Sequence, residues 1–218
     1  MQVEIWSDVV CPWCYIGKRR FETALARVAA TRDVSSIEIA YRAYQLDPTA
    51  APGKVQPVVE AYARKFGGPE RAAQIIDNVT SLAAAEGITF HMDRALRANT
   101  LLAHRLIWFA ETHGDQAALK ERIMRAYFTD GDNVSDPDVL VRCASDTGFD
   151  EAEVRAFLDS DEGHGEVIEQ LAMAASASIT GVPTYVFNGE LAIPGAQDPD
   201  VFERFLHRLL DREAAASA

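Results

Sequence analysis

The 218-residue sequence contains only three cysteines, no long apolar run and far fewer basic than acidic residues. Three cysteines are too few for the disulfide framework that stabilises many small secreted domains. No segment approaches the roughly 18 consecutive apolar residues of a membrane-spanning helix. Because 21 Lys and Arg oppose 33 Asp and Glu, the formal net charge of −12 also argues against a phosphate-binding surface. We therefore expect a globular protein with neither a membrane nor a nucleic-acid partner.

The N-terminal region lacks the features of a secretory signal. No basic residue precedes Lys18, and a strand-like pattern follows Met1 without the apolar stretch and cleavage site of an exported chain. We therefore expect a cytoplasmic protein. In a reducing compartment, two cysteines spaced C-x-x-C indicate redox or metal chemistry rather than a structural crosslink.

Residues 1–48 combine the two main periodicities of regular structure. Alternating polar and apolar residues predict strands over 3–6 and 37–41. Between them, apolar residues at helical spacing predict a helix that contains Phe21, Ala24, Leu25 and Val28. The two strands of such a strand–helix–strand unit should be parallel, with a right-handed crossover.

An inserted helical subdomain is expected over residues 57–160. The stretch before it, from Asp47 to Pro57, holds three prolines, a glycine and several alanines, which is typical of a linker. Several helices then follow one another. Asn99 and Asp115 are the expected N-caps of two of them, because their short polar side chains can accept hydrogen bonds from the first turn.

Residues 161–214 return to a mixed pattern. A helix is followed by a loop at 180–183, a strand over 184–187, the two-residue hairpin turn Asn188-Gly189 and a return strand over 191–193. The last helix begins after Asp198 and carries an apolar stripe. Without the helical insertion, the element order is βαβ followed by αββα around one mixed sheet. The pattern therefore predicts an α/β fold.

The segment Cys11-Pro12-Trp13-Cys14 lies where the first strand leads into the first helix. A thiol at a helix N-terminus faces unpaired N–H groups and the positive end of the helix dipole. This environment favours the thiolate, the nucleophile of disulfide exchange, so Cys11 is the expected attacking residue. Cys14, one turn inward on the same helical face, can resolve a mixed disulfide. Pro12 suits the first helical turn, and Trp13 offers an apolar surface beside the sulfur.

The cysteines and the nearby polar residues also fit other roles. A structural zinc site needs four ligands, and neither Cys143 nor the five histidines form a second close pair, so we predict no metal site. Two inert cysteines at a strand–helix junction would be an unusual coincidence. Cys143 is expected to be a small buried hydrophobe, and His104, among apolar residues, a structural histidine. Two roles are equally consistent with Asp8: it could modulate the pKa of the thiol, or it could be a solvated acid in the loop.

Three segments resemble the DsbA-like thioredoxin superfamily: Cys11-Pro12-Trp13-Cys14-Tyr15, Gly181-Val182-Pro183-Thr184 and Gly195-Ala196-Gln197. The sequence is most similar to the FrnE-like proteins, which are related to 2-hydroxychromene-2-carboxylate isomerases. The resemblance extends over nearly the whole chain. It implies a thioredoxin fold, with a mixed sheet in residues 1–48 and 161–214 and the large helical subdomain inserted between them.

The resemblance also implies a role for the loop before the third strand. It implies a cis peptide bond between Val182 and Pro183, packed beside the dithiol, with the Val182 backbone pairing with an extended substrate. Substrate binding is thus expected at Pro12, Trp13, Val182 and Pro183. Related isomerases carry a glutathione-activating serine where this sequence has Cys11, and the cysteine favours dithiol chemistry. Periplasmic DsbA has histidine where this sequence has Trp13, so its strongly oxidising potential does not carry over.

The leading hypothesis is a thiol–disulfide oxidoreductase, acting as reductase, isomerase or oxidant on a protein or a small molecule. The first alternative is a glutathione-dependent isomerase or transferase that acts on a small aromatic or polyketide-like substrate. The second is a peptide-binding or chaperone module in which the dithiol is incidental. The Cys11/Cys14 pair favours the first hypothesis. No cofactor is expected to be required, with glutathione a candidate thiol co-substrate, and the sequence leaves monomer and homodimer open.

Overall fold

A four-stranded mixed sheet lies at the centre of the protein, for which a computed structural model describes residues 1–216. Its strands are β1 (Gln2–Ser7), β2 (Glu38–Ala43), β5 (Thr184–Phe187) and β6 (Leu191–Pro194), in the order β2-β1-β5-β6. β1 and β2 are parallel, and the other two pairings are antiparallel. The predicted α/β thioredoxin fold is therefore confirmed.

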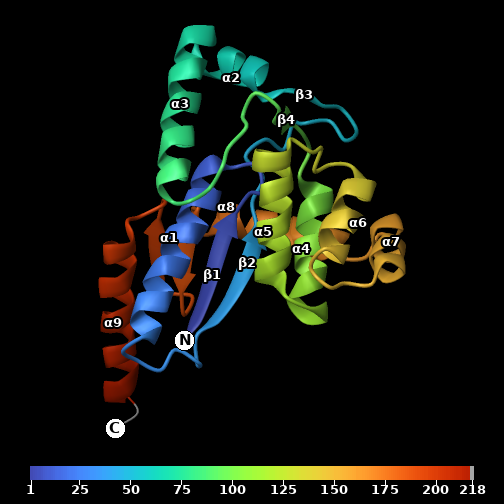
Figure 1. Ribbon diagram of the computed structural model, residues 1–218. Coiled ribbons are helices and arrows are strands. Elements are labelled where there is room, and N and C mark those ends of the chain that lie inside the picture. Colours follow the sequence, from blue (N-terminus) through green and yellow to red (C-terminus); the bar gives the residue numbers. More distant parts are fainter. Residues whose placement is uncertain (217–218) are drawn as a thin grey trace.

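Helices cover both faces of this sheet (Figure 1). α1 (Pro12–Ala29) and α9 (Pro199–Ala216) pack together on one face, where Phe21 lies 5.1 Å from the ring of Tyr185 and 5.3 Å from that of Phe202. α8 (His164–Ser176) covers the other face, where Trp6 is buried. Because side chains alternate along a strand, Ile5 packs into the large apolar core on the α1 side of the sheet, and Trp6 packs into a smaller apolar cluster on the α8 side.

Six further helices lie between β2 and α8 in the sequence. They are α2 (Val58–Phe66), α3 (Pro69–Ala85), α4 (Leu101–His113), α5 (Gln116–Arg125), α6 (Pro137–Ser145) and α7 (Glu151–Asp159). α4 and α5 pack beside β2, and a π-helical turn over Ala126–Asp130 continues α5. α2 and α3 form a hairpin at one end of the molecule, where α3 packs against α1 (Figure 1).

The helix starts follow from short acidic side chains. Asp115, Asp136 and Asp150 are the N-caps of α5, α6 and α7, and each carboxylate accepts a hydrogen bond from a backbone N–H of the first turn. The prediction for Asn99 was wrong by one position, because Thr100 is the N-cap of α4. The Asn99 side chain still serves the helix start, since its Oδ1 accepts from the Leu101 N–H at 2.9 Å.

The stretch expected to be a linker is instead held in place by the helical region. The two-residue strand β3 (Gln56–Pro57) pairs antiparallel with β4 (Leu96–Arg97). Ala50 is buried, and its carbonyl accepts a hydrogen bond from Asn99 Nδ2 at 2.7 Å. These contacts fix the base of the α2–α3 hairpin relative to the sheet.

Candidate active site

Cys11 stands at the junction of strand and helix that the sequence predicts. It is the N-cap residue of α1, with extended backbone (φ −89°, ψ 115°), and Pro12 occupies the first helical turn. No acidic side chain lies in that first turn, so none competes with the Cys11 sulfur for the positive end of the helix dipole. This position stabilises negative charge on sulfur.

Cys14 lies one turn inward and faces Cys11. Its backbone N–H donates to the Cys11 carbonyl at 3.0 Å, and the two thiols lie within hydrogen-bonding reach of each other. No disulfide joins them in the structure, and both are almost fully buried. Burial, followed by the hydrogen bond and charge of Cys11, raises the pKa of the Cys14 thiol well above its ordinary value. Cys14 therefore stays protonated unless a neighbouring group favours its thiolate.

The loop before β5 lies against the dithiol, as the resemblance implies. The Val182–Pro183 peptide bond is cis, and the Val182 carbonyl oxygen lies 3.7 Å from Cys11 Sγ. Gly17 on α1 permits this approach, because a Cβ there would lie 2.9 Å from Pro183 Cγ and 2.8 Å from the Tyr185 hydroxyl. Gly17 was not among the predicted site residues, although a glycine inside a helix can mark a close approach of another segment.

A buried polar pair lies next to the loop that carries Cys11. Asp8 accepts hydrogen bonds from the Cys11 N–H through its carbonyl and from the Leu46 N–H through Oδ2, at 3.2 Å and 2.8 Å. Its Oδ1 is 3.1 Å from Nε2 of His104, and both side chains are only 1% exposed. Asp8 is thus not a solvated loop acid, and His104 is the partner that satisfies its buried carboxylate.

Lys120 on α5 is the residue near the dithiol that the sequence analysis missed. It is 1% exposed, its Nζ has no hydrogen-bond partner among the residues that the structure describes, and it lies 5.1 Å from the centre of the Tyr41 ring. Burial lowers the pKa of Lys120 to about 8, opposed by the negative charges of Cys14, Asp8 and Cys11. A signal existed, because Lys120 occupies the apolar stripe of α5 between Leu119 and Ile123.

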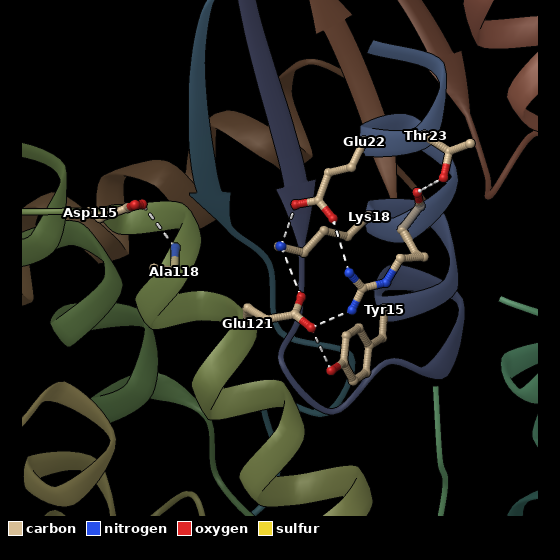
Figure 2. A network of polar contacts seen from close by, with 8 residues as sticks. Tyr15, Lys18, Glu22, Thr23, Asp115, Ala118 and Glu121 are labelled. Carbon is tan, nitrogen blue, oxygen red and sulfur yellow. Dashed lines mark hydrogen bonds and ion pairs between the residues drawn. The ribbon is translucent and has the colours of Figure 1, made fainter. Parts of the chain in front are cut away.

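Glu121, the next residue on α5, ties this helix to α1 (Figure 2). Its carboxylate accepts from the Tyr15 hydroxyl at 2.7 Å, Lys18 Nζ at 2.9 Å and Arg19 Nη2 at 2.6 Å. Burial by itself would raise the pKa of Glu121. The contacts of its carboxylate, led by the charge of Lys18, outweigh burial and lower the pKa. The carboxylate therefore stays ionised, and α5 is held where Lys120 reaches the region of the dithiol.

A cleft of about 810 Å³ opens beside Cys11, between the sheet domain and the α2–α3 hairpin. Pro12, Trp13 and Val182 line it together with Cys11. Pro183 does not line this cleft; it packs against Gly17 and borders a smaller hollow. The opposite wall, which the sequence did not predict, comes from helices of the insertion and includes Val58, Tyr62, Phe66, Ile75, Val79 and Tyr127.

Cys143 takes no part in this arrangement. It is fully buried on α6, its Sγ lies 4.0 Å from the Arg122 carbonyl, and burial raises its pKa to about 11. Within residues 1–216, no group of three or more His, Cys, Asp and Glu side chains is arranged to hold a metal ion.

Comparison with known proteins identifies the family to which this geometry belongs. The model of the DsbA-like thioredoxin domain matches residues 2–207. The chain belongs to this family. A structure from Streptomyces coelicolor, described as a probable DsbA oxidoreductase, is 38% identical, with a TM-score of 0.87 over 95% of this chain and 89% of that one.

More distant structures share the fold alone. The cytosolic disulfide reductase DsbM from Pseudomonas aeruginosa, in a structure with glutathione, is 16% identical, with a TM-score of 0.68 over 97% of this DsbA-like chain and 100% of DsbM. A 2-hydroxychromene-2-carboxylate isomerase is 18% identical, with a TM-score of 0.69 over 100% of both chains. The resemblance to the DsbA-like superfamily inferred from the sequence is confirmed.

Proposed function

We propose that this DsbA-like protein is a thiol–disulfide oxidoreductase in which Cys11 attacks and Cys14 resolves. Membership of the family supports a disulfide oxidoreductase in general. The observation that carries the finer assignment is the placement of Cys11 at the N-cap of α1, lining the cleft, with Cys14 directly behind it.

In the first step the Cys11 thiolate attacks a substrate disulfide. A new bond joins Cys11 to one substrate sulfur, and the other sulfur leaves as a thiolate that takes a proton from water. Val182, 3.7 Å away through its carbonyl oxygen, lies beside the reacting sulfur and offers its backbone to the substrate. Pro12 and Trp13 line the same cleft and contact the substrate there.

In the second step Cys14 loses its proton and attacks Cys11. The substrate sulfur leaves as a second thiolate and takes up a proton, a Cys11–Cys14 disulfide forms, and two electrons have passed to the substrate. When the protein acts as an oxidant, the same steps proceed in reverse. Because burial holds the Cys14 thiol protonated, this step needs help from its surroundings. The backbone of Asp8 and, to a smaller extent, the ammonium of Lys120 supply it, since both lower the pKa of Cys14.

Separate variants of the two cysteines test the division of labour. Cys11→Ser should abolish reduction of insulin, whereas Cys14→Ser should accumulate a mixed disulfide that mass spectrometry detects. Cys143→Ala is the matched control and should leave turnover unchanged, because Cys143 is buried away from the cleft. Equal, mild losses from Cys11→Ser and Cys14→Ser would contradict the assignment.

A second candidate is a glutathione-dependent isomerase or transferase. The cleft of about 810 Å³ is large enough for a small molecule, and glutathione is present in the DsbM structure. This activity would need one thiol or a bound glutathione, not a dithiol. Full activity of Cys14→Ser toward a small substrate, dependent on added glutathione, would favour it over the leading proposal.

The remaining parts of the proposal concern surroundings and partners. We propose a cytoplasmic protein that needs no cofactor, takes disulfides or thiols as substrates and uses glutathione as a thiol co-substrate. No helix in the described part of the chain is long and apolar enough to cross a membrane. Turnover measured with purified protein, with and without glutathione, tests the need for the co-substrate.

A further inference from the structure

Exposed apolar side chains gather around the cleft at Cys11. Trp13, Leu46 and Phe66 are 38%, 38% and 37% exposed, and all three line it. A contiguous exposed apolar surface on a protein of this kind indicates a binding site. In the interior of the cleft, the α2–α3 hairpin adds further apolar side chains: Val58, Tyr62, Ile75 and Val79.

The charge of the cleft is opposite to that of the protein. The chain carries a formal net charge of −12, yet the cleft is lined by three cations, Arg64, Lys65 and Arg97, and by a single carboxylate, Asp47. Arg97 Nε is 2.5 Å from Asp47, so these two largely neutralise each other. The local excess of positive charge therefore lies on α2.

The two cations of α2 are weakly compensated. Arg64 contacts Gln56, and its only ion pair within residues 1–216 joins it to Glu60 at 4.0 Å, with both side chains about 60% exposed and hence screened by water. Lys65 forms no ion pair in the described part of the chain, and its Nζ lies 5.6 Å from the Phe66 ring centre. An anionic group bound here would face two available cations beside an aromatic surface.

Resting on the proposed function, we infer that the substrate is a small disulfide with an apolar, aromatic or aliphatic body and a carboxylate. The volume of about 810 Å³ lies within the range of small-molecule sites. The substrate sulfur meets Cys11, the apolar body lies against Tyr62 and Phe66, and the carboxylate pairs with Lys65 and Arg64. In each turnover the reduced protein converts one such disulfide to two thiols, and Cys11 and Cys14 supply the two electrons.

The test compares the disulfide of 4-mercaptobenzoate with its neutral dimethyl ester. Pre-reduced protein is mixed with each disulfide, and the second-order rate of thiol release is followed by absorbance. Intrinsic reactivity differs between the two disulfides, but it cancels when the rate of each variant is divided by that of the wild type. Arg64→Gln combined with Lys65→Gln should slow the anionic disulfide about three- to tenfold and leave the ester nearly unchanged.

Matched variants separate the site from general electrostatics. Arg71→Gln removes an exposed cation from α3 outside the cleft and should affect neither disulfide. Lys65→Arg keeps the charge and should retain the rate. About 1 M salt, where the screening length falls to about 3 Å, should reduce the wild-type preference for the anion.

The apolar wall has its own variant. Phe66→Ala should slow the aromatic disulfide more than the disulfide of 3-mercaptopropionate, which carries the same charge without a ring. Oxidised glutathione, with its polar peptide body, should react more slowly than the aromatic anion. An acidic peptide disulfide that outruns both would indicate a peptide substrate and overturn the inference.

The inference and the proposed function fail in different ways. Equal effects of the double variant on the anionic disulfide and on the ester, with both rates still dependent on Cys11, would overturn the substrate class and leave the dithiol mechanism standing. No reduction of any disulfide by the wild type would overturn both.

Discussion

Replacing Lys120 with methionine should make the protein more stable and slower at resolving mixed disulfides. Methionine matches the length of the lysine stem and removes only the charge. The pKa of Lys120 is lowered from 10.5 to about 8, so charging it in the folded state is unfavourable by about 3 kcal/mol. Loss of the cation–π contact with Tyr41 offsets about 1 kcal/mol of the gain. We therefore expect the free energy of unfolding to rise by about 2 kcal/mol at pH 7.

The stability gained by Lys120→Met should depend on pH in a characteristic way. Between about pH 8 and 10.5 the unfolded state holds the Lys120 proton and the folded state does not, so wild-type stability rises with pH across this window. Below pH 8 the penalty is present in full. The stability difference between Lys120→Met and wild type, measured by urea unfolding, should therefore be largest at pH 7 and shrink by pH 10. Lys54→Met, an exposed substitution, should show no such trend.

The cost of the substitution should fall on the second chemical step. Lys120 is one of the groups that lower the pKa of Cys14, so its removal raises that pKa. Each unit of increase reduces the fraction of Cys14 present as thiolate about tenfold. We expect resolution of a preformed mixed disulfide to be slower than in the wild type at pH 7, with the deficit declining at higher pH as Lys120 of the wild type loses its proton. Rapid-quench analysis of mixed disulfide decay measures it. A variant that is less stable than wild type and resolves at the wild-type rate would refute the reasoning.

Two further substitutions probe how the site is held. Gly17→Ala should destabilise the protein by about 1–3 kcal/mol and slow insulin reduction, because the new Cβ meets Pro183 and Tyr185; Gly165→Ala on α8, where nothing lies within 4 Å, is the control, and equal effects would contradict the steric argument. Glu121→Gln should lower stability by about 1–3 kcal/mol, since Lys18 loses a buried partner. Because the folded-state pKa of Glu121 is depressed, the stability that its carboxylate contributes is present above the ordinary pKa of 4.5 and is lost as the pH falls through the folded-state pKa. A difference in stability between Glu121→Gln and wild type that persists at pH 2 would refute this role of the carboxylate.

Local patterns predicted most of the elements because each depends on neighbouring residues. Period-two alternation located β1 and β2. Asn188-Gly189, both with positive φ, turns the chain between β5 and β6, but Phe187 pairs with Leu191, so Glu190 makes the loop one residue longer than the predicted two. The position of Cys11 followed in the same way, since a strand end and a helix start lie next to each other in the chain. These features need no knowledge of long-range contacts.

The surroundings of the dithiol could not be predicted, because they come from distant segments. Asp8 and His104 are 96 residues apart, and neither neighbourhood indicates that they meet. The stretch from Asp47 to Pro57 has the composition of a linker, yet Asn99 and Arg97 hold it in place. Composition reports the freedom of the unfolded chain, and these hydrogen bonds form only once the helical insertion has packed.

On the proposed mechanism, the helical insertion serves the chemistry as well as the fold. A sheet flanked by α1, α8 and α9 already places Cys11 at a helix start, but that arrangement leaves Cys14 buried with a raised pKa and Cys11 without a substrate wall. α5 supplies the buried ammonium of Lys120, and α2 and α3 supply the cleft. Glu121 links α5 to α1, so the group that assists Cys14 is attached to the helix that begins at Cys11. Lys120 costs stability and has no hydrogen-bond partner in the part of the chain that the structure describes. The role proposed for it, lowering the pKa of Cys14, gives a reason for a lysine in the apolar stripe of α5.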